Sequence, residues 1–126
     1  MAVFEKRLLR DSTDVLLQLW GGLEEGEELN EIVLEPSKLK EVSSLRLTDV
    51  TYSIQSGLTV LLFWEGESDH TLMLPLEGRG RLDYSWCSGL RDPQDDGWTG
   101  NVLFKTVSTG QGAKHFSLVL EFAKCR

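Results

Sequence analysis

The residues whose types suit acid–base chemistry are two histidines and one group of aspartates: His70, His115, Asp92, Asp95 and Asp96. Nucleophilic catalysis needs a nucleophile, a base and a group that orients the base. Ser88 does not stand in the G-x-S-x-G turn that exposes a catalytic serine, because Trp86 occupies the position where that turn needs glycine. We therefore expect no enzyme, and keep as the enzymatic alternative a site assembled from the three aspartates and His115.

Residues 92–97 have the composition of a calcium-binding loop but not its spacing. Their carboxylates stand at positions 1, 4 and 5 instead of 1, 3 and 5, and the twelfth position is Leu103 where the loop needs glutamate. The two histidines and the two cysteines, Cys87 and Cys125, are too dispersed for a zinc site. We expect no metal, no cofactor, an acidic turn at 92–97 and two free thiols.

Four tryptophans point to binding, because aromatic side chains on a β-scaffold stack on sugars or contact proteins. Trp64 and Trp86 keep register with apolar neighbours and are predicted to lie in the core. Trp98 follows Gly97 in a glycine-rich loop, so we expect it to be exposed or at an interface. The candidate partner contacts are residues expected in loops and turns: Trp98, Arg91, Arg79, Arg81, Glu24, Glu25, Glu27 and Glu28.

The charge of the chain is acidic and uneven. Twenty acidic against 13 basic residues give a net charge of −7, which disfavours binding by phosphate neutralisation, so we expect no direct nucleic-acid partner. Residues 24–35 contain glutamates and neither lysine nor arginine. This stretch is either a solvated loop and strand face, a contact for a basic partner, or a loose site for a divalent cation.

Strands must position these residues, because the apolar side chains alternate with a period of two. The alternation is clearest over 116–122, which together with 102–107 predicts a closing hairpin. Residues 58–64 are apolar without alternation, as in a strand covered on both faces, and Pro75 indicates that 70–76 is an edge strand or that a strand ends there. Further predicted elements are strands at 50–54, 82–86 and 29–34, a strand or one helical turn at 14–19, and a short helix within 38–45.

The length and composition fit a single domain over residues 1–126. Short strands punctuated by glycine predict an all-β fold, either an antiparallel β-sandwich or a jelly-roll-like barrel, with at most one short helix. Residues 1–10 combine charged and apolar side chains and form either part of this domain or an extended arm on a neighbouring subunit. With no secretory signal and no spanning apolar run, we expect synthesis in a cytoplasm and no membrane partner.

Three stretches carry a family resemblance. Residues 49–51 lead into a strand ending Leu62-Phe63-Trp64, residues 80–84 are followed by the turn Thr99-Gly100-Asn101 and a strand, and an aliphatic strand at 116–122 comes last. This order, over about residues 47–124, resembles small virion structural proteins of tailed bacteriophages, especially those that infect cyanobacteria and marine bacteria.

The resemblance implies an all-β protein without catalysis, present in many copies in a virion. The expected role is decoration or cementing of the capsid through contacts with other virion proteins such as the major capsid protein, as a homo-oligomer. A head–tail connector or tail component is the alternative within the particle, and in either case the chain would be made in the host cytoplasm. Independently of the resemblance, the aromatic residues leave open a carbohydrate-binding β-sandwich that uses Trp98.

Overall fold

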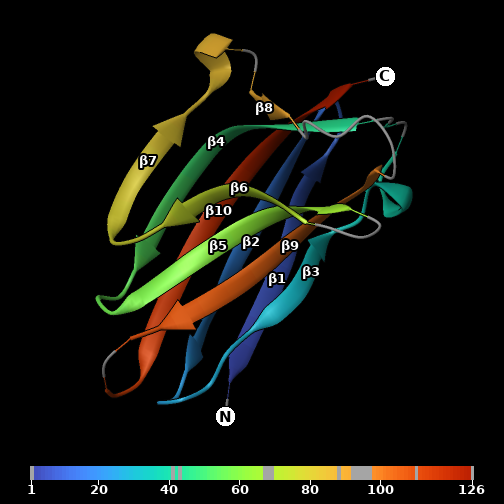
Figure 1. Ribbon diagram of the computed structural model, residues 1–126. Helices are drawn as coiled ribbons and strands as arrows, with labels where there is room; N and C mark the ends of the chain where they lie inside the picture. The colour runs from blue at the N-terminus through green and yellow to red at the C-terminus, as the bar shows by residue number, and fades with distance from the viewer. Residues whose placement is uncertain are drawn as a thin grey trace.

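A computed structural model describes residues 2–40, 42, 44–66, 70–87, 89–91, 98–109 and 111–125, without the side chains of 98, 99 and 125. Two antiparallel sheets lie face to face, which confirms the predicted all-β sandwich (Figure 1). Sheet A is formed, in spatial order, by β1 (Val3–Asp11), β2 (Asp14–Leu23), β10 (Lys114–Cys125), β4 (Ser44–Ile54) and β7 (Arg79–Asp83), with β8 (Leu90–Arg91) also paired to β4. Sheet B is formed by β3 (Asn30–Leu34), β9 (Trp98–Ser108), β5 (Leu58–Gly66) and β6 (Thr71–Leu76).

The core lies between the sheets and follows from side-chain alternation. In β10, Phe116, Leu118, Leu120 and Phe122 are buried, as the period of two predicts. From sheet B, Trp64 meets Phe122 edge to face, with ring centroids 6.3 Å apart. Since these side chains come from the centres of both sheets, the two layers share one hydrophobic core.

Near β1, an aromatic cluster fills the space between the two sheets, and its packing depends on a glycine. Phe4, Phe104 and Phe116 contact one another, with centroids 5.1 to 6.3 Å apart. Gly21 lies between Phe4 and Phe116 in the sheet, and a Cβ there would stand 2.0 Å from the carbonyl oxygen of Val3. Only glycine therefore lets β1 approach β2 closely enough for Phe4 to reach the core.

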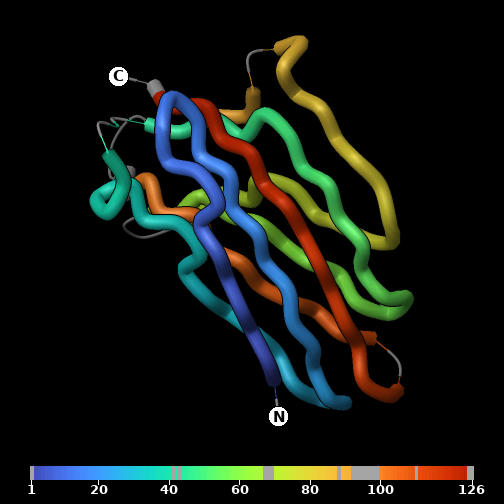
Figure 2. Tube along the Cα trace, turned by 180° about the vertical axis from the view of Figure 1, so that it is seen from behind, coloured from blue at the N-terminus to red at the C-terminus, as the bar shows by residue number. Residues whose placement is uncertain are grey.

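Residues 2–10 do not extend away from the domain. Val3–Asp11 forms β1 and pairs with β2 along its length, with a bulge at Leu9, so this segment is the edge strand of sheet A (Figure 2). The predicted terminal hairpin is wrong in a related way. Residues 102–107 pair with β3 and β5 in sheet B, whereas 116–122 pair with β2 and β4 in sheet A, so the chain crosses between the layers.

Two other predicted elements are wrong for local reasons. The strand predicted over 82–86 ends at Asp83, whose carboxylate accepts hydrogen bonds from the backbone N–H and the hydroxyl of Ser85 at 2.9 and 2.6 Å. This turn leads into the 3₁₀ turn η2 (Ser85–Cys87), and Trp86, predicted in the core, is 82% exposed. In place of the helix predicted within 38–45, the chain forms the 3₁₀ turn η1 (Pro36–Lys38), and β4 begins at Ser44.

Candidate functional site

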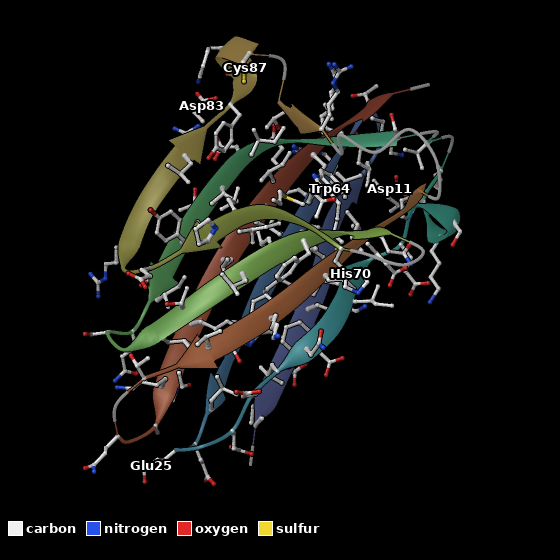
Figure 3. The ribbon with its side chains drawn as sticks, in the orientation of Figure 1. Asp11, Glu25, Trp64, His70, Asp83 and Cys87 are labelled. Carbon is white, nitrogen blue, oxygen red and sulfur yellow. The ribbon has the colours of Figure 1, made fainter. Side chains whose placement is uncertain are left out.

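The predicted contact residues do not gather in one place. Arg79 and Arg81 are exposed on β7, at one edge of sheet A, and Arg91 is exposed on β8. Residues 24–28 follow β2, which β10 and β4 separate from β7. Glu25 lies at the opposite end of the molecule from Cys87 and Asp83 (Figure 3). These residues therefore do not form a single contact surface.

Several of these charged side chains are engaged within the chain. Arg81 binds Asp49 through both carboxylate oxygens, at 2.6 to 3.2 Å. Glu27 accepts hydrogen bonds from the backbone N–H groups of Glu24 at 2.8 Å and Ala2 at 2.7 Å, and these bonds lower its pKa. The acidic stretch thus contains a carboxylate that ties the loop after β2 to the start of β1.

The remaining predicted residues lie apart from one another or outside the described residues. Trp98 begins β9 opposite Gly66, but its side chain lies outside the described part of the chain, as do Asp92, Asp95 and Asp96. His70 is exposed and its Nδ1 accepts a bond from the Gly66 N–H at 3.4 Å. Cys87 is an exposed free thiol. Within the described ranges, no three His, Cys, Asp or Glu side chains come together as a metal site would require.

The outer face of sheet A is polar. The buried residues of these strands, such as Val50 and Leu120, point into the core. The residues between them point outward and form rows across neighbouring strands. From β7 to β2, the rows are Asp83, Asp49, Glu121 and Leu16; Arg81, Thr51, Val119 and Gln18; and Arg79, Ser53, Ser117 and Trp20. Arg81 forms an ion pair with its diagonal neighbour Asp49, and Arg10 on β1 lies 3.9 Å from Glu121. Such a face is suited to water.

The outer face of sheet B is different, because apolar residues form a row across all four strands. The row consists of Ile32, Leu103, Phe63 and Leu72, with Leu61, Pro75 and Val107 beside it. Exposed fractions reach 50% at Leu72 and 39% at Ile32 and Val107, whereas Leu103 within the row is buried, at 7%. We call these seven residues the sheet B face; Lys105, next to Leu61, is a charge in its middle.

The sequence indicated the part of the sheet B face that lies on β5, but not the part that lies on β6. Residues 58–64 were predicted to be covered on both faces, but Leu61 and Phe63 are only half-buried, and no described residue packs over them as a third layer. Regular alternation along β6 would place Leu72 on the same side as Leu74 and Leu76. A bulge places Phe63 opposite Leu72 while Leu62 remains opposite Leu74, so Leu72 turns to the outside.

A second feature is a pocket on sheet A of about 470 Å³. It lies at the end of β1, β2 and β10 nearest the N-terminus, and Trp20, His115 and Val3 form part of its lining. Trp20 is 37% exposed. No role was predicted for Trp20 from the sequence. Glycines inside a strand often mark a place where a ligand can approach the backbone, and here two of them follow the tryptophan directly.

The fold and these two surfaces define a two-sheet β-sandwich with one apolar and one polar outer face. Comparison with known protein families, with curated proteins and with solved structures finds no match to this chain. No helix in the described ranges is long and apolar enough to cross a membrane.

Proposed function

We propose that this chain is a non-enzymatic structural protein of a tailed-phage particle that decorates or cements the capsid, with the sheet B face as its contact surface. The observation that carries the proposal is the apolar row from Ile32 to Leu72 on the outside of the sandwich. The sequence resemblance over about residues 47–124 is the reason for proposing that the assembly is a phage particle.

The sheet B face has the character of the buried centre of a protein interface. Contiguous exposed apolar surface is uncommon on monomers and marks contact sites, whose cores are depleted in charge. Here the seven apolar residues share the outer side of sheet B with Lys105, Asn30 and Thr59, while Glu65 lies toward the end of β5 and Glu77 follows β6. Covering this face would contribute roughly 25 cal/mol for each Å² of apolar surface removed from water.

The polar outer face of sheet A also supports the proposal and indicates how the protein would be oriented on the capsid. A decorating protein needs one surface that adheres and another that stays in solvent. The outer face of sheet A carries ion pairs and hydroxyl groups, such as Arg81–Asp49 and Ser53, that remain hydrated at no cost. We therefore place sheet B against the capsid and sheet A toward solvent.

Mass spectrometry of purified virions tests this function. The chain should be present at a copy number comparable with that of the major capsid protein. Its absence from the particle ends the proposal, and a copy number far below that of the major capsid protein favours the connector or tail alternative. In solution, the decorating role predicts a homo-oligomer, which the mass of the purified chain measures.

A further inference from the structure

We propose that the pocket beside Trp20 is a binding site for neutral pyranose sugars. This site lies on the polar face of sheet A and does not depend on the phage assignment. Its volume of about 470 Å³ falls within the range of ligand pockets and has room for more than one sugar ring. Residues from β1, β2 and β10 line it: Val3, Trp20, Gly22, Glu24, His115 and Phe116.

Within the pocket, the His115 ring lies over the backbone of β2 at Gly22. Gly22 faces outward, since its neighbours Gly21 and Leu23 point into the core, and a Cβ at Gly22 would lie 2.8 Å from Nδ1 of His115. The imidazole thus occupies the space that a side chain would fill. The backbone of His115 is itself fixed by Gln55, whose side-chain oxygen accepts the His115 N–H at 3.0 Å.

Trp20 forms a side of the pocket. It lies on the outer face of β2, opposite Glu5 of β1 and Ser117 of β10, and diagonally from His115. The face of an indole ring is electron-rich and apolar, which suits the C–H groups on one side of a pyranose. Around it, the Ser117 hydroxyl, the His115 imidazole and the carboxylate of Glu5 are groups that can hydrogen-bond to sugar hydroxyls.

The charges beside the pocket select among sugars. Glu24 lines it and Glu5 lies across from Trp20, whereas the cation Arg7 is one row farther away, opposite Gln18. The chain as a whole carries −7. Uronic acids and other anionic sugars would be repelled, so the site should prefer neutral or N-acetylated pyranoses.

Titration of the full chain with three neutral hexasaccharides, maltohexaose, cellohexaose and chitohexaose, and with anionic hexagalacturonate tests the proposal. Two-dimensional NMR should show the Trp20 indole N–H and the amides of Gly22 and His115 shifting with at least one neutral sugar. Unchanged spectra with all three at millimolar concentration overturn the proposal, as does tighter binding of hexagalacturonate.

Variants locate the site. Trp20→Ala should weaken the binding at least tenfold, and Trp20→Phe should restore part of it because it keeps an aromatic face. Trp86→Ala is the matched control, since it removes another exposed indole at a different place in the fold. Equal loss in both alanine variants, or none in Trp20→Ala, contradicts the assignment. Thermal unfolding of each variant establishes that it is folded, and the wild-type shifts stand independently of any variant.

Discussion

The outer faces of the two sheets differ although their inner faces are alike. Both sheets bury alternate aliphatic and aromatic side chains in one core. On the outside, sheet A presents charged and hydroxyl groups such as Arg81, Asp49 and Ser53, whereas sheet B presents Phe63 and Leu72. The folding requirement is satisfied by the inner faces alone. We propose that contact with a partner accounts for the outer apolar row.

The difference arises from the strands at the centre of each sheet. In β10, the residues that alternate with the buried ones are mixed, with His115, Ser117 and Glu121 beside Val119 and Ala123, so the outward side is not uniformly apolar. In β5, the run from Leu58 to Trp64 is apolar except at Thr59, so both faces are apolar. A strand of this kind is typical of a layer covered on both sides. Within the described part of the chain the second cover is missing, which is the reason for placing a partner there.

The largest effect is expected on the sheet B face. Leu72→Asp places a carboxylate at the most exposed apolar position of the row and should weaken adhesion to capsids about 100-fold, or roughly 2.7 kcal/mol. Thr51→Asp, on the outer face of sheet A, is the matched control and should bind like the wild type. Cosedimentation of the purified chain with capsids that lack it measures both. If the two variants bind alike, the two faces do not differ in function.

A smaller effect, on stability, is expected at the ion pair between Lys124 of β10 and Asp11, the last residue of β1. The side chain of Lys124 is 2% exposed and bonds to the Asp11 carboxylate and, at 2.6 Å, to the Lys40 carbonyl. Asp11→Ala leaves this ammonium buried with one partner fewer and should lower the free energy of unfolding by about 2 kcal/mol. Urea denaturation measures the loss, and an unchanged midpoint would contradict this role.

Acid should weaken the ion pairs of sheet A. Hydrogen bonds from Lys124 and Arg10 lower the pKa values of Asp11 and Asp14 below the ordinary value of 3.8. A lowered pKa stabilises the fold above the unfolded value, and this contribution is lost as the pH falls through the folded value. Thermal stability should thus decrease below about pH 4.

Asp14→Asn separates this effect from general acid denaturation. Because Asp14 and Arg10 are partly exposed, the substitution should cost only about 0.5 kcal/mol at pH 7. The difference from the wild type should shrink as the pH falls through the lowered pKa of Asp14, because the carboxyl then becomes protonated. A difference that does not depend on pH would show that the side chain acts by packing and not by charge.

The smallest effect is expected at the Arg81–Asp49 pair. Arg81 is 66% exposed on the edge strand β7, so water and salt screen its attraction to Asp49. Arg81→Ala should leave both the midpoint of urea denaturation and capsid adhesion essentially unchanged. A large loss of adhesion in this variant would make the polar face a contact surface, and urea denaturation would measure any loss of stability.

The sequence predicted the parts of the fold that depend on local pattern. Alternation over 116–122 predicted the buried side of β10, and Pro75 indicated an edge strand or a strand end, of which β6 is the edge strand. Strand partners were not predictable in this way, since alternation identifies the buried side of a strand but not its neighbour, and β9 and β10 fell in different sheets.

The candidate surfaces were less accessible to sequence reasoning. Leu72 turned outward because of a bulge in the pairing of β5 and β6, and Trp86 left the core because the Asp83 carboxylate ends its strand. Both events depend on one or two residues and reverse the side of the sheet that a side chain occupies. The Trp20 pocket depends on β1 and β10 flanking Gly22, a contact between strands far apart in the chain.

Cryo-electron microscopy of the virion tests the central claim most directly. The account predicts density for this sandwich on the capsid, with Phe63 and Leu72 of the sheet B face against the capsid protein and the outer face of sheet A toward solvent. A particle in which the outer face of sheet A makes the contact and the sheet B face is exposed to water would contradict it.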